Sequence, residues 1–122
     1  MGLISSGSSL NIPTGSGSER LRRAVLQGNS NAKTEILSGT AGHIYTILSI
    51  ICAEQQGASG TIQIYVNNGT NDTNILSSIS IGAGTTFVWS DKFVMEEDDD
   101  LDIFNSTTDC DWYVSYIDQD WT

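Results

Sequence analysis

The sequence contains a single histidine, His43, and this scarcity removes most catalytic and metal chemistry. A Ser-His-Asp or Cys-His site would have to use His43, which begins an apolar stretch and has no nucleophile motif around it. One histidine and two cysteines do not provide the ligand spacing of a zinc site, and no glycine-rich phosphate loop with its lysine is present. We therefore expect a protein that is not an enzyme and that needs no cofactor or metal.

Positive charge is also scarce, because five Lys and Arg stand against 15 Asp and Glu, a formal net charge of -10. Such an acidic body repels phosphate, which argues against nucleic acid as a partner. The cations are unevenly placed: residues 1–33 carry a net charge of +3 and residues 34–122 a net charge of -13. Two interpretations stay open, a solvated surface or a cationic segment that binds an acidic neighbour.

Long apolar runs are absent, and no secretory signal with its charged and apolar regions is visible. The longest apolar run, residues 43–53, is about half the length that a membrane-spanning helix needs, so we expect no membrane contact. This run is rich in β-branched residues and contains no glycine, which predicts a strand.

Both sides of this predicted strand are apolar. Strict alternation would place Ile50 and Cys52 on one side, and Tyr45, Ile47 and Ile51 on the other. We expect the core of the domain to cover one side and another subunit to cover the other. The sequence therefore predicts a homo-oligomer interface formed by Tyr45, Ile47 and Ile51.

Helical periodicity is missing from the chain, and proline occurs once. Glycine occurs 12 times, often at turns between short apolar stretches, and Asn68-Gly69 is a strong hairpin signal. About eight short strands follow one another at regular spacing between residues 20 and 122. This spacing predicts an all-β domain with the fold of a jelly-roll-like antiparallel β-sandwich.

The N-terminal arm, residues 1–19, has a composition too rich in Gly and Ser to form a core. It nevertheless contains four spaced apolar residues, and a basic stretch follows it. We expect an extended partner-binding arm with these residues as its contacts: Leu3, Ile4, Leu10, Ile12, Arg20, Arg22 and Arg23. A disordered tail is the alternative.

The two cysteines and one acidic turn each allow two interpretations. Cys52 and Cys110 fall on separate predicted strands and face the core, so we expect two buried thiols, with a disulfide as the alternative. Residues 96–102 hold six carboxylates. We expect a solvated turn there, with a bound cation as the alternative.

Residues 44–117 resemble the small β-sandwich virion proteins of tailed bacteriophages. The resemblance lies in IYTILSI at 44–50, TIQIYV at 61–66, ISIGAGTT at 79–86, KFVME at 92–96, LDI at 101–103 and WYVSY at 112–116. In the acidic turn these proteins usually have Gly-Asp, whereas this sequence has three aspartates at 98–100. The resemblance implies a decoration or cement protein of the capsid, or a tail adaptor or fibre piece, that forms oligomers, often trimers.

These observations lead to one functional hypothesis and one alternative. The hypothesis is a structural protein of a phage virion that decorates the capsid, contacting the major capsid protein or tail proteins through its arm. The alternative is a glycan-binding module of a tail fibre, built on some of the three Trp and four Tyr residues. A sugar platform needs exposed rings, but Trp112 and Tyr116 fall on the predicted core side of the last strand.

Overall fold

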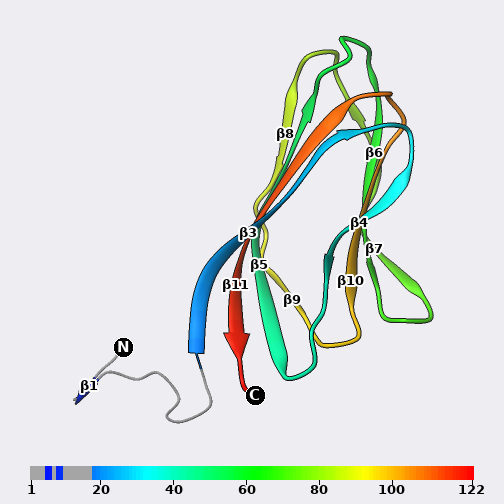
Figure 1. Cartoon of the computed structure of the whole chain (residues 1–122). Helices are drawn as coiled ribbons and strands as arrows, with labels where there is room; N and C mark the ends of the chain where they lie inside the picture. Colours follow the sequence, from blue (N-terminus) through cyan, green and yellow to red (C-terminus); the bar gives the residue numbers. More distant parts are fainter. Residues whose placement is uncertain (1–4, 7, 10–17) are drawn as a thin grey trace.

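The computed structural model describes residues 5–6, 8–9 and 18–122 (Figure 1). Two short strands, β1 (Ser5–Ser6) and β2 (Ser8–Ser9), pair antiparallel. The four apolar residues of the expected arm lie outside the described residues: Leu3, Ile4, Leu10 and Ile12.

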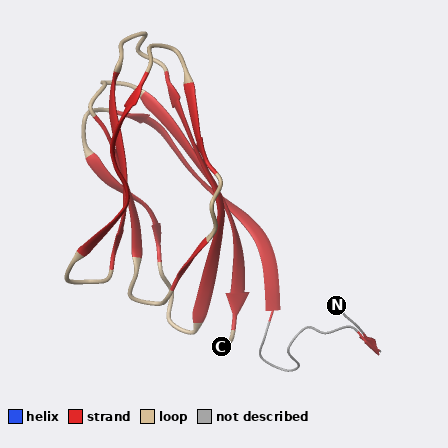
Figure 2. Ribbon diagram, turned by 180° about the vertical axis from the view of Figure 1, so that it is seen from behind, coloured by secondary structure: helices blue, strands red, loops and turns tan. Residues whose placement is uncertain are grey.

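Nine further strands form two antiparallel sheets that face each other as a sandwich (Figures 1 and 2). The first, called here the β5 sheet, consists of β3 (Ser18–Asn29), β5 (His43–Glu54), β8 (Thr86–Trp89), β9 (Phe93–Met95) and β11 (Cys110–Asp120). The second, the β6 sheet, consists of β4 (Lys33–Ser38), β6 (Gly60–Asn67), β7 (Asp72–Ile81) and β10 (Asp100–Asn105). The described residues contain no helix, and the predicted all-β sandwich is confirmed.

The strand order is that of a jelly roll. The β5 sheet runs β3-β11-β5-β8, with β9 also paired to β5, and the β6 sheet runs β4-β10-β6-β7. Strands β8 and β9 occupy one position beside β5, because β8 pairs with residues 50–53 and β9 with residues 45–47. The indole N–H of Trp89 donates to the carbonyl of Asp91, 2.8 Å away, in the interruption between them. This split strand position explains why the sandwich has nine strands where the sequence predicts about eight.

The core fills the space between the sheets with residues that alternate along each strand. Fully buried side chains come from both sheets: Ile47, Ile50, Cys52, Met95, Cys110, Trp112 and Val114 from one, and Ile62, Ile64, Leu101 and Ile103 from the other. Each buried apolar side chain of this size stabilises the fold by about 1.5–3 kcal/mol relative to its exposure. Residues 18–122 thus contain a complete sandwich with its own core.

A bulge in β5 changes which side of that strand faces the core. Ser49 pairs with Ser115 and Ile47 pairs with Tyr116, so Leu48 has no partner in β11. Core-facing residues are therefore Tyr45 and Ile47 before the bulge and Ile50 after it. The prediction that Tyr45 and Ile47 lie with Ile51 on an outer side is wrong, because strict alternation does not pass through a bulge.

Both cysteines are buried free thiols, as expected. Cys52 lies on β5 and Cys110 on the neighbouring β11, and neither is exposed at all. In the part of the chain that the structure describes, no helix is long and apolar enough to cross a membrane.

Candidate assembly surface

The side of the β5 sheet that faces away from the core carries apolar side chains on every one of its strands. One cross-strand row consists of Val25, Tyr113, Ile51 and Val88, which pair in that order across β3, β11, β5 and β8. Val88 is 55% exposed, Val25 45% and Tyr113 38%. Ile51 at the centre of the row is half-buried by its neighbours. The outward position of Ile51 agrees with the sequence prediction, and its role in an interface stays a prediction.

A second row runs parallel to the first, nearer the end of the sheet where the chain terminates. Leu21 pairs with Ile117, Ile117 with Thr46, and Thr46 with Val94 of β9. Leu21 is 73% exposed, the largest value among the large apolar side chains of the described residues. We call these two rows together the apolar face, and its apolar members are Leu21, Val25, Ile51, Val88, Val94, Tyr113 and Ile117.

Polar groups occupy the strip between the rows. Arg23 pairs with Ser115, and Ser115 with Ser49. The guanidinium of Arg23 lies over the ring of Tyr113, 5.9 Å from its centroid, which is a cation–π distance. A hollow of about 380 Å³ opens here, lined by Leu21, Arg22, Arg23, Tyr113 and Ser115. The apolar face is therefore a shallow surface with one indentation along β3 and β11.

The outer side of the β6 sheet is rich in charged residues by contrast, with Lys33 among several carboxylates. Lys33 forms an ion pair with Asp72, lies 3.9 Å from the carboxylate of Asp102, and stacks 4.6 Å from the ring centroid of Tyr65. The hydrogen bond to Asp72 raises the pKa of Lys33, and the same bond lowers the pKa of Asp72. Burial raises the pKa of Asp102 and, with the nearby carboxylates of β10, that of Glu35.

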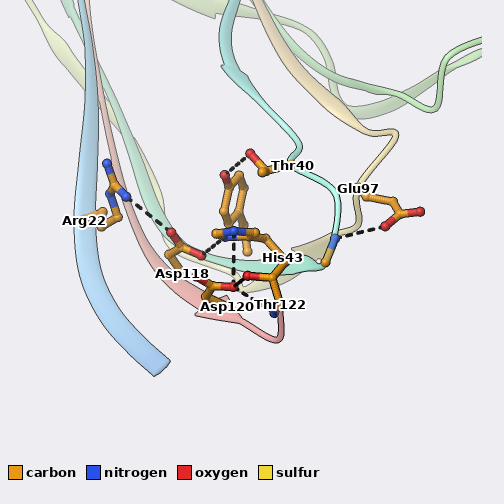
Figure 3. A network of polar contacts seen from close by, with 9 residues as sticks. Arg22, Thr40, His43, Glu97, Asp118, Asp120 and Thr122 are labelled. Atoms are coloured by element: carbon orange, nitrogen blue, oxygen red, sulfur yellow. Dashed lines mark hydrogen bonds and ion pairs between the residues drawn. The ribbon is translucent and has the colours of Figure 1, made fainter. Parts of the chain in front are cut away.

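A polar cluster at one end of the sandwich fastens three strands of the β5 sheet together (Figure 3). Asp118, which is 2% exposed, accepts from His43 Nδ1 at 2.7 Å and lies 3.4 Å from a guanidinium nitrogen of Arg22. The other ring nitrogen of His43 lies 3.4 Å from Asp120. The two ring nitrogens of the only histidine thus tie β5 to β11, and Arg22 ties β3 to Asp118 of β11.

The three basic residues of the expected arm belong to the sandwich and not to a free arm. All three lie on β3, because that strand begins at Ser18. Arg22 pairs with Asp118 of its own chain, and Arg23 stacks on Tyr113. Arg20 is exposed, with Asp118 of β11 opposite it. The partner-binding role that the sequence predicts for them is untested.

Two carboxylates of the acidic turn between β9 and β10 accept hydrogen bonds from backbone N–H groups of the same chain. Glu97 accepts from the backbone N–H of Gly42 at 3.1 Å, and Asp99 accepts from that of Glu96 at 2.8 Å. The turn borders an open hollow of about 530 Å³ that Trp121 also lines. Among the described residues, no group of three His, Cys, Asp or Glu side chains is placed to hold a metal ion.

The aromatic residues do not form one platform. Trp112 is fully buried and Tyr116 is 5% exposed, in agreement with the sequence prediction. Tyr113 and Trp121 are exposed, but they lie eight positions apart, which corresponds to about 26 Å of extended chain. Two rings so far apart cannot stack on neighbouring sugars, so this arrangement does not favour the glycan-binding alternative.

Sequence reasoning missed most of the apolar face. Val25, Val88, Val94 and Tyr113 are single apolar residues in short strands, and each alone is ordinary on a protein surface. Only the pairing of distant strands brings them into two rows. The available signal was the alternation of β11, where Tyr113 and Ile117 occupy positions that a solvated sheet fills with polar residues.

No protein-family model matches the sequence, and no curated protein matches it either. Solved structures with a similar fold include a chain of the disulfide-linked pili of Bacillus endospore appendages. It is 12% identical, has a TM-score of 0.54, and the match covers 87% of this chain and 89% of that one. A chain from the structure of infectious bursal disease virus, Gx strain, is 10% identical with a TM-score of 0.55, and the match covers 86% of this chain and 33% of that one.

A third similar structure is the CBM22-1–GH10 part of xylanase 10B from Clostridium thermocellum in complex with xylohexaose. It is 12% identical, and the match covers 85% of this chain and 26% of that one, with a TM-score of only 0.41. The chain therefore spans about a third or less of the viral and xylanase chains that it matches. At these identities the comparisons show the fold alone: this chain is a jelly-roll sandwich of a kind that also occurs in a pilus and in a virus.

Proposed function

We propose that the protein is a non-enzymatic structural subunit that assembles with copies of itself, as a capsid decoration protein of a bacteriophage virion does. The observation that carries the proposal is the difference between the two outer sides of the sandwich. One side is rich in charged residues, and the other presents seven apolar residues from five strands. Apolar surface of this kind is favourable to bury, at about 25 cal/mol per Å².

The partner that fits best is another copy of the same chain, with a trimer as the favoured assembly. The pilus and virus chains of similar fold support this choice, since both come from assemblies of many subunits. A disulfide link between copies is not part of the proposal, because the only two cysteines are fully buried. Contact with a major capsid protein or with tail proteins belongs to the same proposal, and places the protein in the virion.

The test is the molar mass of the purified protein by light scattering over a range of concentrations. The expected mass is a multiple of 13.2 kDa. Changing Val25 and Val88 to Asp should reduce it to that of a monomer, because two carboxylates would then have to be desolvated in the contact. A control variant changes Thr73 and Ser80 to Asp, which adds the same charge on β7 of the other sheet, and should keep the wild-type mass.

A strictly monomeric wild-type protein would overturn the proposal of self-association. An oligomer whose mass is unchanged in the Val25 and Val88 variant and reduced in the control would overturn the choice of the apolar face as the contact.

A further inference from the structure

We infer that the apolar face of one copy receives the N-terminal segment, residues 1–17, of another copy. This inference rests on the proposed function and specifies how the copies meet. The alternative contact places two apolar faces against each other. Three observations favour the segment: the distribution of charge, the groups between the two apolar rows, and the point where the segment joins the sandwich.

The distribution of charge favours a contact between segment and face over a contact between two faces. Residues 1–17 contain no charged side chain, so the whole net charge of -10 belongs to residues 18–122. Two such bodies repel each other when their broad sides meet. The N-terminal segment itself adds no charge to the contact. It also carries four apolar residues, Leu3, Ile4, Leu10 and Ile12, for an acceptor surface that is itself apolar.

The strip between the rows suits a peptide better than a second sheet. Arg23 lies in that strip over the ring of Tyr113. In a two-fold contact of identical faces, both copies would bring Arg23 into the same interface, and two like charges would lose water there. A peptide laid across the strip supplies backbone carbonyls and serine hydroxyls that accept from Arg23. The hollow of about 380 Å³ beside it has room for a branched apolar side chain.

The segment joins the sandwich at an edge of the acceptor sheet. It ends at Ser18, where β3 begins, and β3 is the outermost strand of the β5 sheet. The eight residues between β2 and Ser18 alone span up to about 28 Å when extended, whereas the strands of this sheet cover a width of about 20 Å. The segment is therefore long enough to leave its own body and cross the apolar face of a neighbour.

A contact of this kind is heterologous, because the donating and accepting surfaces differ. Repeated around an axis it closes into a ring, and a trimer is one such ring. Each copy then gives one segment and accepts one. The donating and accepting surfaces can therefore be mutated separately, and the result distinguishes this contact from a face-to-face contact.

The experiment uses two variants of the full chain. The segment variant changes Leu10 and Ile12 to Ser and keeps the apolar face. The face variant changes Val25 and Val88 to Asp and keeps the segment. Each is expected to be monomeric alone in sedimentation velocity, and an equimolar mixture is expected to form a one-to-one complex. In that complex the intact segment of one variant occupies the intact face of the other.

Matched controls replace Ser5 and Ser8 by Ala in the segment, and Thr73 and Ser80 by Asp on β7, and both should keep the wild-type mass. A segment variant that assembles alone as the wild type does would overturn this inference and leave the proposed function standing, since it indicates a face-to-face contact. Two monomeric variants that fail to combine would also overturn it. A monomeric wild type would overturn the inference and the proposed function together.

Discussion

At the scale of single residues, Asn105 organises the buried polar part of the sandwich. Its carbonyl oxygen accepts from Asn29 Nδ2 at 2.6 Å and from the indole N–H of Trp112 at 3.0 Å. Its amide nitrogen donates to the backbone carbonyls of Asn29 and Thr107, each at 2.8 Å. These are all four hydrogen bonds that a side-chain amide makes, and Asn105 is fully buried. One residue thereby joins β3, β10 and β11 across the two sheets.

Replacing Asn105 with Ala should lower the free energy of unfolding by about 3 kcal/mol or more, because several buried donors and acceptors lose their partner at about 1–3 kcal/mol each. Urea titration followed by tryptophan fluorescence measures this. Asn74→Ala, at an exposed position on β7, is the matched control and should change stability by less than about 0.5 kcal/mol. Equal effects of the two substitutions would show that the network contributes nothing.

Glu54 holds two loops at the opposite end of its strand from His43. Its carboxylate accepts from the backbone N–H groups of Gly84 at 2.7 Å, Gln56 at 2.7 Å and Gly57 at 2.9 Å. These bonds, that to Gly84 first, lower the pKa of Glu54. A carboxyl with a lowered folded-state pKa stabilises the fold above its unfolded value of about 4.3, and loses that effect as the pH falls through the folded value.

Glu54→Gln should therefore be less stable than the wild type at pH 7, and the difference should narrow as the pH is lowered below about 4.3. Thermal melts of both proteins across this range measure it. A difference that stays constant down to acid denaturation would show that the charge of Glu54 is not what holds the loops.

The sequence predicted some of these residues and could not predict others. Trp112 and Tyr116 are large apolar residues at alternating positions, so their burial follows from the pattern of their strand. Asn105 and Glu54 are polar residues next to turns, where solvent exposure is the ordinary expectation. Their burial depends in part on backbone groups far away in the sequence, Gly84 for Glu54 and Asn29 for Asn105, which no local pattern contains.

At the scale of elements, the bulge at Leu48 determines how β5 serves the core. Alternation predicts the strand correctly but fixes only the relative sides of neighbouring residues. The inserted residue moves Ile50 and Cys52 to the same side as Tyr45 and Ile47, so all four enter the core. The strand position along the opposite edge of β5 is interrupted at the same level, where it divides into β8 and β9.

Deleting Leu48 should prevent formation of the native sandwich, because the residues on one side of the deletion would turn outward. Leu48→Ser keeps the backbone length and should remain folded, with a loss of about 1 kcal/mol. Near-ultraviolet circular dichroism and a thermal melt distinguish the two. A deletion variant with the native aromatic signal and a cooperative transition would contradict the importance of the bulge.

At the scale of the whole molecule, the two outer sides of the sandwich have opposite character. The fold class followed from strand spacing, and the idea of a second apolar side followed from residues 43–53 alone. Which residues form that side did not follow, because Val25, Tyr113 and Val88 come from three strands far apart in the chain. Their alignment is a property of the sheet and is absent from any single stretch of sequence.

The salt dependence of association distinguishes an apolar contact from an ionic one. The bodies of the copies carry a net charge of -10 and repel each other, and added salt shortens the Debye length from about 10 Å at 0.1 M to about 3 Å at 1 M. Association through the apolar face should therefore strengthen several-fold over this range in sedimentation equilibrium. Weakening with salt would instead support the other interpretation of the charge pattern, a cationic stretch such as Arg20 to Arg23 on an acidic neighbour.

The central claim is that another copy covers the apolar face. The two native thiols are buried, and burial raises the pKa of Cys52 and Cys110, so both stay protonated and unreactive in the folded protein. A cysteine introduced by Val88→Cys can then be labelled alone, and Thr73→Cys on β7 serves as its control. The most direct measurement is the alkylation rate at each position in assembled protein and in protein diluted to monomers. If another copy covers the apolar face, assembly slows the reaction at position 88 by about tenfold or more and leaves position 73 unchanged. Equal rates at position 88 in both states would contradict this covering.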